Sequence, residues 1–461
     1  MAATITAPMK RRFIDEFKND ADSASVRYFI GIARSEDWND SDAAPTPLNT
    51  EKEERDFRHG LQSVKQVADY SFVIPRVNWS AGTTFGAYND QQVAHPTVPY
   101  YAMTESNQVY VCLKAGTNTS GASVPSTVQP TGSAVTSFST ADGYGWKFLY
   151  TVGTLDAAAY MFETFISVKL QGATTGESPA TDVEQLTIQT AADSGREVVG
   201  FALDSGGAGY SSAPTVTITG NGTGCAATAT VSGGAVTKIT LNDSSNGALK
   251  MGVGYDFASV ALSGGGSPTK VATAKINLGP KTGFGADPRN DLRARAIMFN
   301  AKPVGTEEGE FIVDNSFRQI GLLRNPLQPD SAIAGSAFTA SDGNALRRLQ
   351  LASISTAFTL RSTITGGTSG AKAFIDKTDS DEIWYHQTET TGFIQFQENE
   401  AVTDAAGGAG TTQATGTDAD DDAFVKPKVD KYSGDLLYIE NRAAVTRAAD
   451  QTEDIKVIIE I

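Results

Sequence analysis

The sequence predicts a mainly β protein: a β-sandwich-like core with a few helices as a minor α+β component, and two small inserted β domains. Glycine is abundant, at 45 of 461 residues, and much of it stands beside Thr, Ser, Ala and Val, as in short strands joined by tight turns. Many short runs alternate apolar and polar residues, the period of a strand with one buried face. Hydrophobic residues make up 40% of the chain, enough for a sizeable core.

The N-terminal region is predicted to mix helices with strands. Residues 10–20 are expected as a short helix and residues 26–33 as a strand with one strongly buried face. Thr50 and Glu53 form a capping box, and the apolar spacing after it predicts a helix that continues to Ser71. Residues 72–75 then run extended, because Pro75 disfavours the helical region for the residue before it. Further strands are predicted at 109–113, 146–152, 162–170, 435–441 and 455–461.

Two blocks differ in composition from the rest of the chain. Residues 183–277 are poor in charge, and Gly207-Ala-Gly-Tyr210 recurs as Gly252-Val-Gly-Tyr255, 45 residues further on. This block is expected to be an inserted β domain with two pseudo-repeats. Residues 353–425 are expected to be a second inserted β domain, leaving 1–175, 278–350 and 430–461 as a discontinuous β-rich core. The strands predicted in the second block are 358–365, 371–375, 383–386 and 393–396.

The net charge and the two cysteines limit which partners and sites are expected. The net charge is −16, which disfavours nucleic acid because phosphates are bound through cations. Basic clusters at 10–12, 289–295 and 347–348 are short and interleaved with acids. Cys112 and Cys225 have no partner at ligand spacing, so neither zinc nor a disulfide scaffold is expected. No apolar stretch reaches the roughly 18 residues of a membrane span, and no export signal opens the chain.

No catalytic or metal-binding arrangement is evident from the spacing of ionisable residues. His59, His95 and His386 do not fall into a zinc-binding or nucleophilic pattern. The Gly-rich run 220–224 lacks the Lys-Ser/Thr ending of a phosphate loop. The acidic loop 418–422 lacks the Gly and Glu of a calcium-binding EF-hand, and whether it binds a cation stays open. We therefore expect a non-enzymatic protein with no cofactor and no metal.

Large aromatic residues stand beside Arg and Pro in several short segments. Taken in order, these segments resemble the baseplate wedge subunit of T-even-type contractile-tailed phages, the family of the gene eight product. The resemblance covers about residues 29–170, 283–326 and 432–461, roughly half the chain. The segments are 31–38 (GIARSEDW), 73–79 (VIPRVNW), 109–113 (VYVCL), 142–149 (DGYGWKFL), 317–326 (FRQIGLLRNP), 433–442 (SGDLLYIENR) and 450–455 (DQTEDI).

The resemblance implies a structural, mostly β protein that forms a homodimer and joins other baseplate wedge proteins. Such a protein is assembled in the host cytoplasm and resides in the virion, in the tail baseplate. It neither binds nucleic acid nor inserts into a membrane. The two β blocks lie outside the matched segments, so their role stays open.

The residues that carry the resemblance are expected to have a structural or interface role. The tryptophans among them are expected to pack into the core, and the arginines to hold nearby carbonyls or carboxylates. Direct contact with a partner subunit is the alternative, and the basic stretch 289–295 is a further candidate for such a contact. The residues are Arg34, Trp38, Pro75, Arg76, Trp79, Tyr144, Trp146, Phe317, Arg318, Asn325, Pro326, Tyr438, Asn441 and Arg442.

Two other functions are alternatives to this structural role. The first is a tail-associated adhesin that binds host surface glycans through its β insertions, with Tyr210, Tyr255 and Trp384 on the binding face. The second is a glycan-degrading tail enzyme, which ranks lowest because no catalytic constellation supports it.

Overall fold

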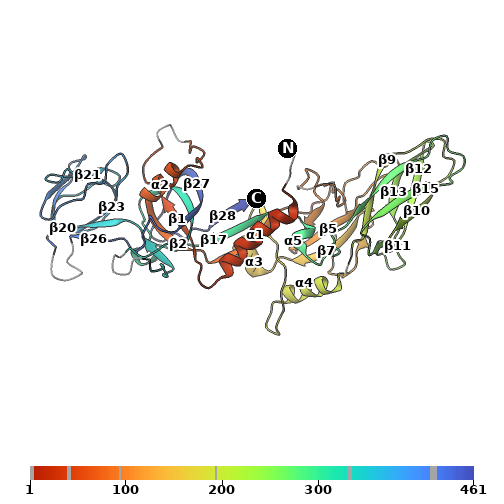
Figure 1. Ribbon diagram of the computed structural model, residues 1–461, viewed down its shortest axis with the longest axis horizontal. Helices are drawn as coiled ribbons and strands as arrows, with labels where there is room; N and C mark the ends of the chain where they lie inside the picture. The colour runs from red at the N-terminus through yellow and green to blue at the C-terminus, as the bar shows by residue number, and fades with distance from the viewer. Residues whose placement is uncertain are drawn as a thin grey trace. The chain divides into compact units, whose positions relative to one another are not determined.

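The computed structural model describes residues 5–38, 43–92, 95–192, 195–329, 335–415 and 423–460. It is mainly β, with antiparallel sheets, as the sequence predicts (Figure 1). The chain divides into two compact units, a different division from one core with two insertions. Unit 1 comprises Met1–Asp15, Ser71–Met298 and Ile458–Ile461, and unit 2 comprises Glu16–Tyr70 and Phe299–Val457.

Unit 1 contains a four-stranded sheet with the order β4-β5-β7-β6. Its long strands are buried almost throughout, which explains their continuous apolar runs. The aromatic side chains of Phe85, Tyr110, Trp146 and Phe148 fill the adjoining core, and Ile188 of helix α4 packs with them. The strands are β4 (Tyr101–Met103), β5 (Gln108–Lys114), β6 (Phe138–Ser139) and β7 (Gly145–Thr151).

Helix α4 (Ala180–Ala191) corrects the expectation that residues 183–277 are entirely β. Its Thr, Val and Ile content favours a strand, but two polar contacts hold the helix. Gln185 donates a hydrogen bond to the carbonyl of Lys169, and Gln189 donates one to that of Gln171. The local propensity is therefore overridden by tertiary contacts.

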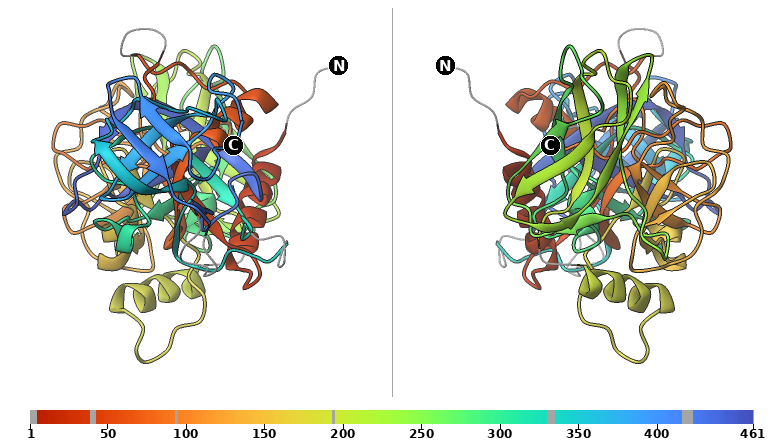
Figure 2. Two further views of the ribbon diagram at one scale, coloured as in Figure 1. Left: turned by 90° about the vertical axis from the view of Figure 1, so that its left-hand side faces the viewer. Right: turned by 90° about the vertical axis from the view of Figure 1, so that its right-hand side faces the viewer.

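The first β block follows α4, and its two halves exchange strands (Figure 2, right, in green). The first strand of each half pairs with the last strand of the other half: β9 with β16, and β13 with β12. The middle strands, β10 and β15, pair with each other. This pattern matches two pseudo-symmetric halves. The strands are β9 (Val198–Ser205), β10 (Thr215–Gly220), β11 (Thr223–Cys225), β12 (Ala227–Ser232), β13 (Ala235–Leu241), β14 (Met251–Val253), β15 (Ala258–Ser263) and β16 (Thr273–Leu278).

The repeated Gly-x-Gly-Tyr motif has the same conformation in both halves. Gly207 and Gly252 have φ of +66° and +65°, a region that favours glycine. A Cβ at either position would press on the ring of the motif's own tyrosine, Tyr210 or Tyr255. Both tyrosines are buried, so they are core residues and do not form the glycan-binding face considered for the adhesin alternative.

Polar contacts fix the first β block to the four-stranded sheet within unit 1. The ammonium of Lys238 donates to the Thr117 carbonyl at 3.3 Å, and the hydroxyl of Thr237 donates to the Thr119 carbonyl at 3.0 Å. Ser139 of β6 donates to Asp243 at 2.8 Å. The block is thus joined to its unit by several side chains as well as by the chain itself.

A further sheet has the order β28-β17-β3-β8. The chain passes from one unit to the other within helix α1 and within strands β3, β17 and β28. The run 162–170, predicted as one strand, is extended in β8 over three residues only. The elements are α1 (Ala7–Asp22), β3 (Asp69–Pro75), α3 (Thr154–Tyr160), β8 (Phe165–Ser167), α5 (Pro288–Asp291), β17 (Ala296–Ala301) and β28 (Ile455–Glu460).

Unit 2 is built on a five-stranded sheet with the order β19-β2-β1-β18-β27. Helix α2 (Glu51–His59) begins at Thr50, whose hydroxyl accepts a hydrogen bond from the amide of Glu53, as the capping box predicts. The prediction that this helix continues to Ser71 is wrong. It ends at Gly60, a weak helix former, and Leu61 starts a strand. The strands are β1 (Tyr28–Ala33), β2 (Leu61–Gln66), β18 (Ser316–Arg324), β19 (Asp342–Asn344) and β27 (Asp435–Thr446), and a short 3-10 helix, η1 (Glu307–Gly309), precedes β18.

Phe57 seats helix α2 on this sheet. Its buried ring lies over Gly31 of β1 and Gly321 of β18, which are paired across the two strands. A Cβ at Gly321 would overlap the ring, and one at Gly31 would lie 2.8 Å from Leu61. The two glycines therefore provide the space in which the helix packs.

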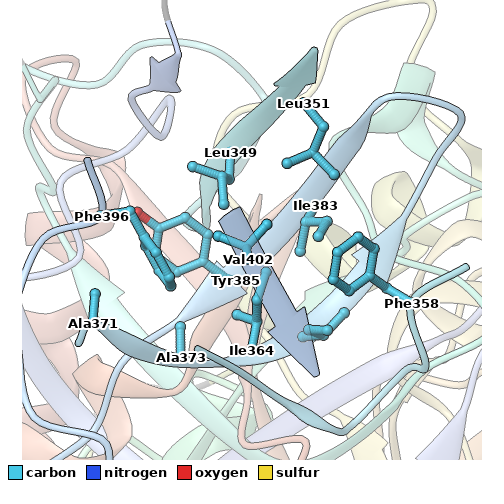
Figure 3. Close-up of a cluster of buried hydrophobic side chains, with 11 residues drawn as sticks. Leu349, Leu351, Phe358, Ile364, Ala371, Ala373, Ile383, Tyr385, Phe396 and Val402 are labelled. Atoms are coloured by element: carbon cyan, nitrogen blue, oxygen red, sulfur yellow. The ribbon is translucent and has the colours of Figure 1, made fainter. Parts of the chain in front are cut away.

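The second β block forms a closed barrel in unit 2. The strands run in the order β23-β22-β21-β24-β25-β20, and pairing between β20 and β23 closes the ring. Apolar side chains such as Ile364, Ile383 and Val402 fill the interior (Figure 3). Residues 393–396, predicted as a strand, have no strand structure. The strands are β20 (Arg347–Thr356), β21 (Thr363–Gly366), β22 (Lys372–Thr378), β23 (Glu382–His386), β24 (Ala401–Asp404), β25 (Ala409–Thr412) and, paired with β20, β26 (Phe424–Val425).

Gly321→Ala is expected to lower the free energy of unfolding by about 1–3 kcal/mol, because the added methyl group must displace the Phe57 ring. Gly172→Ala is the matched control, since a Cβ there meets nothing within 4 Å. Urea denaturation of both variants measures the difference. Equal stability of the two would show that Phe57 is not tightly seated.

Candidate functional site

The residues that carry the resemblance separate into two groups, one in each unit. Neither group gathers as a set around one cavity; both build sheets, turns and the loops beside them. Unit 1 contains Pro75, Arg76, Trp79, Tyr144 and Trp146, and unit 2 contains Arg34, Trp38, Phe317, Arg318, Asn325, Pro326, Tyr438, Asn441 and Arg442.

The unit 1 group belongs to the core around the four-stranded sheet. Trp146 is fully buried and its ring stacks on that of Tyr144 at 5.8 Å. The indole of Trp79 donates to the hydroxyl of Ser126 at 3.1 Å. Arg76 donates to the carbonyl of Phe162, and the carbonyl of Pro75 accepts from the phenol of Tyr101. These side chains hold strand β3 and its neighbours in place.

In unit 2, arginine and tryptophan fix the loop that leaves β1. Buried Arg318 of β18 binds the carbonyl of Ser35 and the carboxylate of Asp37. Arg34 stacks on the ring of Trp38, with 4.2 Å from its guanidinium carbon to the ring centroid. The indole of Trp38 in turn donates to the carbonyl of Arg442 in β27, at 3.1 Å. The loop is therefore tied to two strands of the sheet.

The rest of the unit 2 group shapes turns and strand ends. Asn325 has a φ of +51°, and its side-chain oxygen accepts from the amide of Arg27 at 2.8 Å. Phe317 and Pro326 are buried. The phenol of Tyr438 donates to Glu440 two residues along the same strand.

Strand β27 forms an edge of the five-stranded sheet, since it pairs with β18 alone among the described strands. Near its middle, Asn441 donates to the carbonyl of Pro45, so the 43–50 segment lies against it. Beside its first half is a groove of about 440 Å³, which we call the edge groove. Leu48 and Leu437 are 65% and 38% exposed there. The edge groove is lined by residues 47–51, Glu54 and 436–439.

A buried ion cluster links the barrel to the sheet in unit 2. His386 of β23 has no exposed side-chain surface, and its Nδ1 lies 2.5 Å from the carboxylate of buried Asp376. Its Nε2 lies 3.1 Å from the carboxylate of Glu36, in the loop after β1. Asn315, just before β18, donates to the carbonyl of Asp376 at 2.9 Å. The imidazole therefore joins two strands of the barrel to the loop after β1, and Asn315 contacts the same cluster through Asp376.

The charges of this cluster set its protonation state. Burial alone would lower the pKa of His386, but the carboxylates of Asp376 and Glu36 outweigh it and raise the pKa to about 10. Burial would raise the pKa of Glu36, but the charge and hydrogen bond of His386 lower it to about 2. His386 is thus an imidazolium at neutral pH, with both N–H groups donating. In this state it has no free nitrogen to accept a proton.

Burial lowers the pKa of the other two histidines, in contrast to His386. His59, the last residue of α2, is buried, and its ring lies 4.9 Å from that of Phe393. Burial lowers its pKa. Burial also lowers the pKa of His95, to about 4. Trp384, considered for a glycan-binding face, is buried with Ile312.

The basic stretch 289–295 is engaged within unit 1. Arg289 forms ion pairs with Asp15 and Asp287. Arg293 donates to the carbonyl of Asn89 and stacks between the rings of two tyrosines. The hypothesis that this stretch is a free contact patch is therefore not supported by its geometry.

Metal-binding clusters and membrane-spanning helices were not expected from the sequence. Across the described ranges, no three His, Cys, Asp or Glu side chains are grouped so as to hold a metal ion. The acidic loop 418–422 lies outside the described residues. Among the helices that the structure describes, none combines the length and hydrophobicity of a membrane crossing.

No spacing of residues in the sequence indicates the ion cluster. Asp376 is 10 residues before His386 and Glu36 is 350 residues before it, so no local spacing joins them. The one hint was a histidine at the end of an apolar strand, where a buried ring needs a polar partner.

His386→Gln is expected to destabilise the protein by about 3–5 kcal/mol near pH 6, because it leaves buried carboxylates without their cation. The folded-state pKa of His386 lies above its ordinary value of 6.5. The stabilisation is therefore fully present below about pH 6.5 and is lost as the pH rises through about 10. On the acid side, the contribution of Glu36 is present above 4.5 and is lost as the pH falls toward about 2.

Denaturation of wild type and variant between pH 5 and 10 measures this difference. His95→Gln is the control, and its effect should not change between pH 7 and 10. A deficit for His386→Gln that is the same at pH 6 and at pH 10 would contradict the ionic origin.

No protein-family model matches this sequence, and no curated protein matches it either. The function is therefore inferred from the residues and from their geometry.

Proposed function

We propose that the chain is a structural subunit of a contractile-tail baseplate wedge, which acts by dimerisation and by contacts with other wedge proteins. The segments that resemble this family support the proposal by their placement. They supply buried strands, ring stacks and arginine-carbonyl contacts in both units. Such residues give each unit a fixed shape, which a multi-subunit assembly requires.

The observation that carries the proposal is the edge groove. An edge strand leaves backbone N–H and C=O groups unpaired, and proteins usually protect such edges. Here a strand of 12 residues ends the sheet, and exposed Leu48 and Leu437 lie beside it. Exposed apolar side chains next to an open edge favour burial against another protein surface.

We assign the edge groove to a second copy of this chain. Antiparallel pairing of two β27 strands about a two-fold axis beside Leu437 sets the two Leu437 side chains against each other. Asp435 then stands opposite Ile439 of the other copy, so no like charges meet directly. The 43–50 segment covers the strand further along, at Asn441, which limits pairing to the first half.

The double variant Leu48→Glu with Leu437→Glu is expected to convert a dimer into a monomer. Each buried leucine that becomes charged costs about 2 kcal/mol or more of association free energy, so the two together raise the dissociation constant at least about 1000-fold. Sedimentation velocity over a concentration series measures the change. The matched control is Leu155→Glu on α3, at a leucine that is 78% exposed, and it should leave the dimer intact.

Co-expression with the other tail proteins of the same phage tests the assembly role. The wild type should be recovered in a complex with them. A wild type that stays monomeric at every concentration and captures no tail protein would sink the proposal. If the double variant still dimerises like the wild type, the dimer contact does not lie in the edge groove.

A further inference from the structure

A second cavity in unit 2, of about 670 Å³, lies where the barrel meets the turn at residues 430–432. Arg347 of β20, Tyr385 of β23 and residues of β26 form one side. We call it the basic pocket. Its volume is in the range that holds small organic ligands. The lining comprises residues 327–329, Gly335, Ala345, Arg347, Tyr385, 424–427 and 430–432.

The charge of the basic pocket is opposite to that of the whole protein. Among the residues that the structure describes, Arg347, Lys426 and Lys431 line it with a single acid, Asp430, in a chain of net charge −16. The Asp430 carboxylate is engaged in its own turn, where it accepts from the amide of Tyr432 at 3.0 Å. Three cations gathered in an acidic protein favour an anionic ligand.

Lys431 is held close to a second cation. Its ammonium donates to the carbonyl of His59 at 2.8 Å, which uses one of its three hydrogens. Burial, with a smaller effect of the Arg347 charge in the same direction, outweighs the opposing effect of Asp376 and lowers the pKa of Lys431 to about 8. A bound anion would reduce the repulsion between the two cations.

The remaining walls are apolar. Leu327, Phe424, Val425 and Pro427 line the cavity. Tyr432 stands at the opening with 54% of its surface exposed. An exposed aromatic ring packs well against the C–H face of a flat, amphipathic molecule. The pocket thus suits a ligand with one apolar face and one anionic group.

The lining strands leave little room for a peptide main chain. Arg347 is paired with Tyr385, and Leu349 is paired with Phe424. Peptides that bind along strands use unpaired backbone groups at a sheet edge. Here β20 is paired on both sides, and β26 offers an open edge of two residues only. A compact ligand recognised by side chains fits this arrangement better than an acidic peptide does.

We propose that the basic pocket binds a carboxylate-bearing sugar, with the carboxylate on Arg347, Lys426 and Lys431 and the sugar ring against Tyr432. An arginine with two lysines recognises a carboxylate through charge-assisted hydrogen bonds. This site goes beyond the proposed structural role and does not depend on dimerisation. Its lining does not include Tyr210, Tyr255 or Trp384, which are buried.

The test is calorimetric titration of the full chain with trigalacturonate, at low and at moderate salt. Binding in the millimolar range or tighter is expected, with weakening at higher salt. Neutral galactotriose should bind at least about tenfold more weakly, a difference of about 1.4 kcal/mol. Lys426→Gln and Tyr432→Ser change exposed residues and should each weaken trigalacturonate binding about tenfold or more without changing the melting temperature.

Lys281→Gln is the matched control, at an exposed lysine of unit 1. It should leave binding unchanged. The proposal is overturned if trigalacturonate does not bind, if galactotriose binds equally well, or if the two pocket variants bind like wild type. Equal binding of triglutamate would also overturn it, in favour of an acidic peptide. Sedimentation of the pocket variants separates this result from the first proposal, since their dimerisation should be unaffected.

Discussion

The seating of Phe57 on Gly31 and Gly321 is the packing constraint on which the geometry of unit 2 depends. Because neither glycine has a side chain, helix α2 lies close to the sheet. The buried guanidinium of Arg58 then binds the carbonyls of Ser433 and Gly434 at 2.7 and 2.8 Å, just before β27. The helix and the edge strand are thus fixed together, and the edge groove between them has a defined shape.

The two β blocks differ in how they pair the edges of their strands. The second block closes six of its strands into a barrel, and β26 adds to the outside of β20. The first block exchanges strands between its halves, so that each half completes the other. Each block is also fixed to its unit by polar contacts, through His386 in one case and Lys238 in the other. These blocks are therefore integral parts of rigid units.

The candidate site was only partly predictable. Aromatic and arginine-rich segments were expected to act as scaffold or contact residues, and the structure places Trp146 in a core and Arg318 on a backbone carbonyl. The edge groove could not be predicted, because it is formed by residues 47–51, Glu54 and 436–439, which are far apart in the sequence. The basic pocket could not be predicted for the same reason: its cations come from β20, from the residue after β26 and from the turn at 430–432.

The sequence by itself determined the β class, the buried strands at 109–113 and 146–152, and the repeated Gly-x-Gly-Tyr turns. These follow from local rules of residue alternation and of glycine's backbone freedom. Only the tertiary structure decided that the helix begun at Thr50 ends at Gly60, since Leu61 and Val64 fit a helix face and a buried strand equally well. Pairing with β1 and β19 selected the strand, because burial and hydrogen bonding with distant residues outweigh local preference.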